Sequence, residues 1–396
     1  MNEPKLRFKA DDGSQFPDWK EKKIGDLFYK VNERNNGQFG KDKWISVAKM
    51  YYQDEDKVTS NNIDTRTYVM RIGDMAFEGH PNKEFKYGRF VVNDIGDGII
   101  SELFPIYRHK GEYVLKYWKY AIQIDTIMQK IYRKAITSSG ASSNKLDNND
   151  FENQSIPVPC LEEQQKIAEF LSTVDTVIEK QKETVSAWEE RKKGVMQKLF
   201  SQEVRFKADD GSDFPEWEEK KLGDVFTERT ERSKGGESLL SVTIAEGIIK
   251  QSETDKRNIA SENKSNYKIV KKNDLAYNTM RMWQGAEGVS EYDGIVSPAY
   301  TVITAVDGNN SYFFETMFKQ TFMLQVFQRF SQGLTSDTWN LKFPAFSEIK
   351  CQVPCEDEQN KIVECVAVLD DVIEKQKETL AAWEELKKGL LQQMFV

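Results

Sequence analysis

The sequence contains one long stretch twice, and this duplication restricts the possible fold more than any other feature. Residues 158–200 read VPCLEEQQKIAEFLSTVDTVIEKQKETVSAWEERKKGVMQKLF, and residues 353–395 read VPCEDEQNKIVECVAVLDDVIEKQKETLAAWEELKKGLLQQMF. The two copies share 26 identical residues in 43. Two helices of similar composition would not agree so closely by chance, so one segment was duplicated.

Each copy is predicted to form a long helix with one narrow apolar stripe. Apolar residues recur at alternating spacings of four and three, which is the pattern of a coiled-coil seam. A helix of about 40 residues is about 60 Å long and must cover this stripe, and the other copy is the expected partner. The alternative is that each helix packs only on its own domain. The predicted seam consists of Ile167, Leu171, Val174, Ile178, Val185 and Trp188 in the first copy and of Ile362, Val366, Leu369, Ile373, Leu380 and Trp383 in the second.

A second repeated block sets the order of the chain. Residues 5–28 and 203–226 share 17 identical residues in 24, so the order is block, variable segment and helix, then the same again. The first helix ends beside the second block, whereas no block follows the second helix. If the helices pair antiparallel about a two-fold axis, the second helix returns to the first block. The sequence therefore predicts pseudo-two-fold symmetry, with one globular domain at each end of the helix pair.

The variable segments, residues 29–155 and 227–350, are expected to share one mixed fold. Short apolar runs between Gly, Asn and Asp indicate strands, and longer aromatic-rich runs indicate helices packed on them. The predicted class is α+β, with two similar globular domains joined by two long helices in an antiparallel coiled coil. The predicted parts are a first globular domain (1–155), a central helix (156–200), a second globular domain (201–350) and a distal helix (351–396).

Composition and charge indicate a globular protein with different partners for its parts. The chain is 39% hydrophobic and 12% aromatic, and it has neither an apolar run of membrane-spanning length nor a signal peptide at its start, so we expect a cytoplasmic protein. Residues 29–155 hold 19 basic and 17 acidic residues, and residues 227–350 hold 15 of each. The net charge of the two variable segments together is therefore +2. Because the whole chain carries −8, the blocks and helices carry −10. These acidic parts are suited to protein partners, and the variable segments are the parts that can meet DNA.

The sequence offers no recognisable catalytic or metal site. There is no glycine-rich phosphate loop and no N-P-P-(Y/F) or D-P-P-(Y/F) methyltransferase motif. Asp18, Glu21 and Lys23 resemble a nuclease pattern, but the acids are too close together and the segment belongs to a repeated block. His80 and His109 have no ligand-like neighbours, and the four cysteines form no C-x-x-C pair. We therefore predict no catalytic residue and no bound metal.

Several motifs resemble those of a known family. The V-P-x-x-x-E-Q-x-K-I opening of each helix, and NDLAYNTMRMWQGAEG with DGIVSPAYTV in residues 273–302, resemble specificity subunits of type I DNA restriction-modification systems. The resemblance covers nearly the whole chain and includes the duplication. The first variable segment departs from it, since GDMAFEGHPNKEF lacks the N-x-M-R-x-W string.

This resemblance implies a noncatalytic subunit that recognises DNA. Each variable domain would be a target recognition domain that reads one half of a bipartite, asymmetric site, and the helix pair would set the spacer. Double-stranded DNA, two modification (methyltransferase) subunits and restriction (translocase/nuclease) subunits would be the partners, in an adenine-N6 methyltransferase and ATP-dependent endonuclease complex. S-adenosylmethionine and ATP with Mg²⁺ would bind to those subunits and not to this chain.

The alternative hypothesis is a coiled-coil scaffold that binds proteins and has no DNA specificity. The near-neutral charge of the variable segments is compatible with such a scaffold. Divergence of these segments between preserved blocks favours DNA recognition.

Candidate DNA contacts are polar, aromatic or cationic residues in predicted loops of the two variable domains. Trp283 can equally be a core residue and Arg281 the partner of an acid, the run at 142–145 can be a solvated turn, and the isolated lysines can be ordinary surface charges. The candidates in the second domain are Asn278, Arg281, Trp283, Gln284, Ser336, Thr338, Trp339, Asn340 and Lys342; those in the first are Ser142, Ser143, Asn144, Lys145, Lys41, Lys43, Lys83, Lys86 and Arg89.

Overall fold

The chain forms two compact units, each with one globular part and a portion of both long helices. The computed structural model describes residues 4–81, 85–139, 143–244, 246–253, 264–335 and 338–395. Unit 1 consists of Met1–Glu183 and Lys377–Val396, and unit 2 consists of Thr184–Gln376.

The globular part of unit 1 is built around an antiparallel four-stranded sheet in the order β2-β9-β6-β7. The two-stranded pairs β1–β12, β3–β4, β5–β8 and β10–β11 complete it. Its strands are β1 (Lys20–Lys23), β2 (Phe28–Val31), β3 (Ile45–Ser46), β4 (Tyr51–Tyr52), β5 (Thr67–Met70), β6 (Met75–Glu78), β7 (Arg89–Val92), β8 (Gly98–Ser101), β9 (Ile106–His109), β10 (Ile136–Ser139), β11 (Ser143–Leu146) and β12 (Ser155–Val158). Its own helices are α1 (Ile24–Leu27), α2 (Leu115–Ala121), α3 (Asp125–Ala135) and α4 (Asn148–Glu152).

Unit 2 repeats this architecture with different side chains. Its four-stranded sheet has the order β14-β21-β18-β19, and the pairs β13–β22, β15–β16 and β17–β20 accompany it. Its strands are β13 (Glu218–Lys221), β14 (Phe226–Glu228), β15 (Leu240–Thr243), β16 (Gly247–Lys250), β17 (Lys268–Val270), β18 (Leu275–Asn278), β19 (Glu287–Val289), β20 (Gly294–Val296), β21 (Tyr300–Ala305) and β22 (Lys350–Val353). Its own helices are α6 (Leu222–Val225), α7 (Ser311–Phe318), α8 (Thr321–Phe330) and α9 (Phe343–Ser347).

The central strand of each sheet is buried on both faces. Side chains alternate between the two faces of a strand. On β6, Met75 and Phe77 join the core formed with α2, α3 and α4, while Ala76 belongs to a second core on the other face. On β18, Leu275 and Tyr277 likewise join the core formed with α7, α8 and α9, and Ala276 faces the opposite core. The strands therefore read as short, almost wholly apolar runs.

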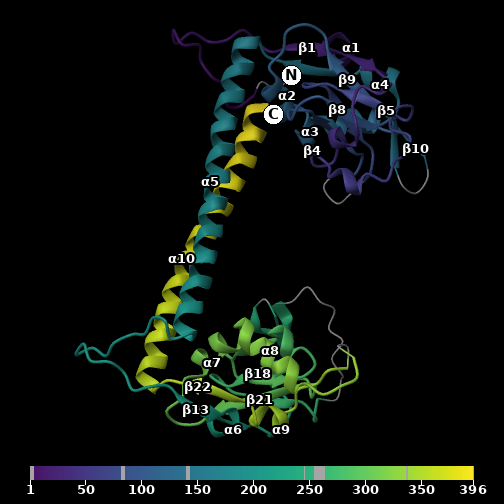
Figure 1. Ribbon diagram of the computed structural model, residues 1–396. Helices are drawn as coiled ribbons and strands as arrows, with labels where there is room; N and C mark the ends of the chain where they lie inside the picture. Colours follow the sequence, from purple (N-terminus) through teal and green to yellow (C-terminus); the bar gives the residue numbers. More distant parts are fainter. Residues whose placement is uncertain are drawn as a thin grey trace. The chain divides into compact units, whose positions relative to one another are not determined.

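The two long helices, α5 (Leu161–Phe200) and α10 (Glu356–Phe395), pair antiparallel in each unit (Figure 1). In unit 1, Lys387 Nζ lies 2.5 Å from Asp175 Oδ1, and Lys182 Nζ lies 3.7 Å from Glu384 Oε1. Residue numbers on α10 thus fall as those on α5 rise. In unit 2, Lys192 Nζ lies 2.5 Å from Asp370 Oδ1. The alternative in which each helix packs only on its own domain is wrong.

The residues of the predicted seam are buried or half-buried in the structure. In unit 1, Leu390 and Met394 of α10 pack into the core that contains Ile167 and Leu171 of α5. The aromatic and leucine positions near the middle of the helices are less completely covered. The buried seam residues are Ile167, Leu171, Val174, Ile178, Val185, Ile362, Val366 and Ile373, and the half-buried ones are Trp188, Leu369, Leu380 and Trp383.

The second helix meets the first repeated block, as the order of the repeats predicted. The Leu6 N–H donates to the Gln393 carbonyl at 3.0 Å, and the rings of Trp19 and Phe395 lie 6.1 Å apart in an edge-to-face arrangement. The fold class, two similar mixed units with an antiparallel helix pair, is therefore confirmed.

A buried glutamate in the E-Q-x-K-I motif fixes each block to the helix that follows it. In unit 1, the Arg7 Nε and Nη2 atoms donate to Glu163 at 3.1 and 2.9 Å, and Trp19 Nε1 donates at 3.1 Å. The Glu163 side chain is fully buried. Three donors, two of them from a guanidinium, offset the loss of hydration of this carboxylate.

Unit 2 repeats this arrangement with the matching residues. Arg205 donates to Glu358 at 3.1 and 2.8 Å, and Trp217 Nε1 donates at 3.0 Å. The lysine of the motif reaches the turn of the block, since Lys361 Nζ lies 2.6 Å from Asp209. Block and helix are thus one structural element, although about 150 residues separate them in each half of the sequence.

Candidate nucleic-acid interface

In unit 2, a tight loop joins β18 to β19 and carries the first set of candidate DNA contacts. Asn278 ends β18, where its Oδ1 accepts from the Met280 N–H at 3.0 Å and its own N–H donates to the Ala286 carbonyl at 2.9 Å. The loop contains a short 3₁₀ helix that Gly285 closes with a φ of 81°, a conformation that favours glycine. The side chain of Met282 is buried in the core and anchors the loop.

A second polar segment packs against this loop. Gln332 and Asn340 exchange backbone hydrogen bonds of 3.0 and 2.8 Å, and the Leu341 N–H donates to the Thr279 carbonyl at 2.8 Å. The rings of Trp283 and Trp339 meet edge to face, with their centres 5.2 Å apart. The structure therefore brings together the two sets of candidates in unit 2, which lie about fifty residues apart in the sequence.

The candidate side chains of unit 2 differ in how far the protein itself uses them. The Trp283 indole N–H donates to the Met280 carbonyl at 3.2 Å, and the Thr338 hydroxyl donates to the Thr335 carbonyl at 2.9 Å, so these two side chains stabilise the loops. Within the described part of the chain, the side chains of Arg281, Gln284 and Lys342 form no hydrogen bond or ion pair. They are the ones available to phosphates and base edges. Ser336 lies outside the described residues.

Unit 1 has a matching pair of segments. The Asn144 N–H donates to the Gly79 carbonyl at 2.8 Å, which joins the loop after β6 to a later polar segment as the bond from Leu341 to Thr279 does in unit 2. Gly79 is required here, since a Cβ would lie 2.1 Å from the Asn144 carbonyl oxygen. Ser143 pairs with Ser139 in the β10–β11 hairpin, and Lys145 is exposed. Ser142 and Lys83 lie outside the described residues.

The other cationic candidates of unit 1 are engaged within the protein. Lys41 Nζ donates to the Val58 carbonyl at 3.1 Å, Lys43 Nζ lies 4.7 Å from the centre of the Tyr52 ring, and Lys86 Nζ lies 5.5 Å from that of Tyr87. These contacts favour their interpretation as surface charges with local roles. They leave Lys145 as the first-unit candidate that is both cationic and exposed without a contact of this kind in the described residues.

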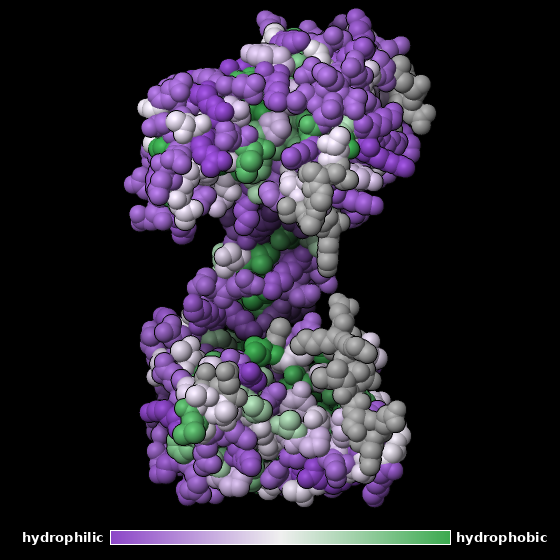
Figure 2. All heavy atoms as spheres, turned by 90° about the vertical axis from the view of Figure 1, so that its right-hand side faces the viewer, coloured by the Kyte–Doolittle hydropathy of each residue, from purple (hydrophilic) through white to green (hydrophobic). Residues whose placement is uncertain are grey.

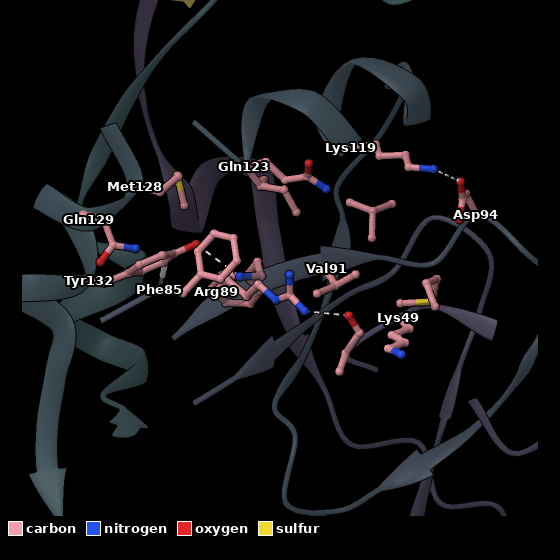
Figure 3. A pocket seen from close by; sticks show the side chains of 15 residues that line it. Lys49, Phe85, Arg89, Val91, Asp94, Lys119, Gln123, Met128, Gln129 and Tyr132 are labelled. Carbon is pink, nitrogen blue, oxygen red and sulfur yellow. Dashed lines mark hydrogen bonds and ion pairs between the residues drawn. The ribbon is translucent and has the colours of Figure 1, made fainter. Parts of the chain in front are cut away.

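Arg89 is held even more firmly, at the edge of a cavity of about 250 Å³ (Figure 3). Its Nε donates to Glu78 at 3.0 Å and its Nη2 to the Ala48 carbonyl at 2.5 Å, while the guanidinium lies 4.8 Å from the centre of the Phe85 ring. Figure 3 shows this arginine beside Phe85 and Tyr132, with Lys119 turned toward Asp94. Arg89 therefore has a structural role in holding β7 against the preceding loops.

The surface of each unit on one side is mostly hydrophilic (Figure 2). Hydrophobic residues reach this face of the globular parts in small, separate groups. Interfaces with DNA are more polar than those between proteins, so such a surface is compatible with contact to a nucleic acid.

A buried glutamate at the base of the unit 2 loop was not predicted from the sequence. Glu287, the first residue of β19, lies opposite Tyr277 of β18 and is fully buried. Neither of its carboxyl oxygens has a hydrogen-bond partner among the described residues. Lys319 Nζ lies 3.9 Å from Glu287 Oε1. Burial raises the pKa of Glu287 well above its ordinary value, and Lys319 opposes this effect only in part.

This carboxyl should make the stability of unit 2 depend on pH. Below the ordinary glutamate pKa of about 4.3, Glu287 is protonated in both the folded and the unfolded state. Above that pH the unfolded chain releases the proton and the folded chain keeps it, so stability should fall by up to about 1.4 kcal/mol per pH unit until the folded pKa is reached. Urea unfolding from pH 5 to pH 8 measures this slope.

The matched variant is Glu287→Gln, which keeps the shape of the side chain but cannot ionise. We expect its unfolding free energy to fall less steeply with pH than that of the natural chain. Parallel curves for the two proteins would contradict the assignment.

Among the described residues, no helix is long and apolar enough to cross a membrane. No group of three or more His, Cys, Asp or Glu side chains in the same residues is arranged to hold a metal ion.

The chain thus consists of two units of one mixed fold, which are joined by an antiparallel helix pair. Each unit presents a pair of polar loops. These features define a class of duplicated recognition protein. A family model described as the type I restriction modification DNA specificity domain matches residues 17–186 and 215–382. The two matches together cover most of the chain. The chain therefore belongs to the family of type I restriction-modification DNA specificity domains.

Individual relatives agree with this assignment. The putative type I restriction enzyme MjaX specificity subunit of Methanocaldococcus jannaschii is 26% identical over 242 residues, which is 54% of this chain and 55% of that protein. The type I restriction enzyme MjaVIII specificity subunit of the same organism is 38% identical over 93 residues, or 22% of each protein. The chain thus matches about half the length of the first relative and about a fifth of the second.

Solved structures share the fold over the full length of the chain. The crystal structure of the type I restriction-modification S subunit from M. genitalium has a TM-score of 0.52 at 16% identity, covering 100% of this chain and 99% of that one. A chain from a structure concerned with complex assembly and conformational transition of the type I restriction-modification system has a TM-score of 0.57 at 17% identity, with coverage of 96% and 98%. At this level of identity the likeness shows the fold alone.

Proposed function

We propose that this chain is the noncatalytic DNA-recognition subunit of a type I restriction-modification complex. Each unit reads one half of a bipartite, asymmetric target, and the pair α5 and α10 sets the spacer and docks the modification subunits. The catalytic groups, S-adenosylmethionine and ATP with Mg²⁺ belong to the partner subunits, and the complex acts on DNA in the cytoplasm.

One observation supports this function above the others. The two units share a framework, in which the loop after β6 or β18 is hydrogen bonded to a later polar segment, but they carry different side chains on it. A common framework with different contact residues is what the reading of two different half-sites requires, because base edges are distinguished by the donors and acceptors placed against them. Family membership supports the same function.

Methylation mapping tests the proposal. The chain, produced with the modification subunit encoded beside it, should direct adenine methylation to one bipartite motif in host DNA. Exchange of residues 29–155 for the corresponding segment of another family member should change one half of that motif and leave the other half unchanged. A stable complex that methylates no specific sequence would contradict the proposed function.

Variants of the available cations show whether the loops of unit 2 form the interface. Arg281→Ala and Lys342→Ala should each weaken binding of the complex to its motif. If a phosphate contact is lost, the logarithm of the binding constant should also fall less steeply with the logarithm of the salt concentration, by about 1 in the magnitude of the slope. Lys43→Ala is the matched control, since its ammonium group already contacts Tyr52. Unchanged binding and an unchanged salt slope for both Arg281→Ala and Lys342→Ala would exclude these loops as the interface.

A further inference from the structure

Helix α3 of unit 1 has one strongly basic side. Lys130, Arg133 and Lys134 are exposed, and their spacing of three and four residues places them together on one side of the helix. Met128 and Tyr132 lie on the other side, where they belong to the core of the unit and line the cavity beside it (Figure 3). The protein therefore covers the apolar side of α3 and leaves the cations uncovered.

The charges on this side of the helix are not balanced within the protein. In the part of the chain that the structure describes, Lys130, Arg133 and Lys134 form no hydrogen bond, ion pair or ring contact. Like charges four residues apart, such as those of Lys130 and Lys134, destabilise a helix. The stability of unit 1 thus gives no reason for this arrangement.

The acidic residues nearest in sequence have other positions and partners. Residues 126–146 contain four basic residues and no acidic one. Asp125 is the first residue of α3, where a negative charge stabilises a helix. Asp147 caps α4, since its Oδ1 accepts from the Asp150 N–H at 2.9 Å. The net charge of residues 126–146 is therefore +4.

Helix α3 is continuous with the candidate loops of unit 1. Gln129 Nε2 of α3 donates to the Gly88 carbonyl at 3.5 Å, and Asn144 Nδ2 of β11 donates to the Lys86 carbonyl at 3.3 Å. The β10–β11 hairpin, which carries the exposed Lys145, follows α3 directly in the chain. The helix, the loop after β6 and the hairpin thus lie together.

Unit 2 provides an internal comparison, because α8 is the counterpart of α3. Met323 and Phe327 of α8 are buried in the core of unit 2, as Met128 and Tyr132 of α3 are in unit 1. Both pairs are four residues apart, and an offset of 195 relates them. The two helices also end at matching positions by this offset.

The exposed side of α8 lacks most of the charge of α3. Residues 321–341, at the same offset, contain one basic and one acidic residue, whereas residues 126–146 contain four basic ones. The shared fold therefore does not require the cations, which are particular to unit 1. At the positions of Lys130, Arg133 and Lys134, unit 2 has Gln325, Gln328 and Arg329.

We propose that the basic face of α3, formed by Lys130, Arg133, Lys134 and Lys145, binds the phosphate backbone of DNA at the half-site that unit 1 reads. This role rests on the proposed function, because a subunit that met no DNA would have no such backbone to bind. Contacts to phosphates carry affinity and position the protein, and they do not depend on the base sequence. Unit 2 makes fewer of these contacts through its neutral counterpart.

The dimensions of the face suit a DNA strand. From Lys130 to Lys134 the helix rises by about 6 Å, at about 1.5 Å per residue. Phosphates of one strand follow one another at about 3.4 Å along the DNA axis. The helical cations therefore span about two nucleotides of one strand.

Substitutions that copy unit 2 test this role. Lys130→Gln and Arg133→Gln introduce residues that α8 already accommodates, so the fold should be retained. In the complex with modification subunits, each should reduce the magnitude of the slope of log binding constant against log salt by about 0.9. This change corresponds to about eightfold weaker binding at 0.1 M salt. Fluorescence anisotropy of a labelled duplex that contains the motif, from 50 to 200 mM salt, measures both quantities.

The loss should be independent of sequence. The two glutamine variants should weaken binding to an unrelated duplex by the same factor, because phosphates are the same in every sequence. Methylation mapping should still return the natural motif in both halves. A change in the bases of the motif would contradict a backbone contact.

Two control variants separate this effect from other causes. Lys134→Arg copies Arg329 of unit 2 and keeps the charge, so affinity and salt slope should stay the same. Lys22→Gln removes an exposed lysine from β1 in the repeated block and should also leave the slope unchanged. An equal effect of Lys22→Gln would attribute the loss to net charge and overturn the proposal.

The remaining outcomes distinguish this role from the proposed function itself. Unchanged slopes for both glutamine variants, in a complex whose natural form binds its motif, would overturn the role of α3 and leave the proposed function intact. Loss of the modification subunits from the variants, measured by size-exclusion chromatography, would overturn it by assigning the face to a protein partner. If the natural complex bound no duplex at all, the proposed function would fail and this role with it.

Discussion

Replacing Arg205 with alanine should lower the free energy of unfolding by about 3–5 kcal/mol, because a buried carboxylate would be left without its charged partner. Glu358 is 1% exposed, and two of its three hydrogen bonds come from this arginine. The remaining bond from Trp217 cannot compensate for the charge. Urea unfolding followed by tryptophan fluorescence measures the change as a lower midpoint.

Two further variants distinguish the loss of the buried ion pair from the removal of an arginine in general. Arg232→Ala removes an exposed arginine of the same unit and should change stability by less than about 0.5 kcal/mol. Adding Glu358→Gln to Arg205→Ala removes the buried charge and should restore part of the loss. A loss for Arg205→Ala as small as that for Arg232→Ala would show that the buried pair does not hold the block to the helix.

Removing one heptad from both long helices should shorten the spacer of the DNA target by about three base pairs. Deleting residues 179–185 together with their repeat mates 374–380 keeps the seam in phase, because the pattern repeats every seven residues. Each helix becomes shorter by about 10 Å, and the DNA rise is about 3.4 Å per base pair. Methylation mapping of the altered complex reads the new spacer directly. This expectation rests on the proposed role of the helix pair.

The single deletions are the controls for this experiment. Removal of residues 179–185 alone shortens α5 but not α10, so the Asp175–Lys387 and Lys192–Asp370 pairs can no longer both form. We expect such chains to lose specific methylation. A double deletion that changes the bases of either half-site would contradict the separation of spacer and recognition functions.

The helix pair was predictable because its signals are local and repeated. The seam has a fixed period, and a stripe of that kind has few ways to be covered. The return of α10 to the first block followed from the order of the repeats, and the bond from Leu6 to Gln393 confirms it. A further signal was present but unused: Arg7, Trp19 and Glu163 all have identical repeat mates, and these three residues meet in the structure.

The candidate interface was less accessible to sequence reasoning, because it depends on contacts between distant segments. The residue types of the polar runs could be read, but not the hydrogen bond that joins Thr279 to Leu341. Whether Trp283 faces a partner or supports its own loop depends on Trp339, far along the chain. Glu287 was missed because a single glutamate between glycine and alanine gives no pattern that distinguishes burial from exposure.

The make-up of unit 1 has a consequence for how the chain folds during synthesis. Unit 2 is one continuous stretch, Thr184–Gln376, whereas unit 1 also needs Lys377–Val396. At about 5–20 residues per second, a ribosome takes about 10–40 s to translate the intervening stretch. Before α10 has been synthesised, the surface of unit 1 that later packs against Leu390 and Met394 is not covered by that helix. Unit 1 is the first to be synthesised, but it should therefore complete its folding after unit 2.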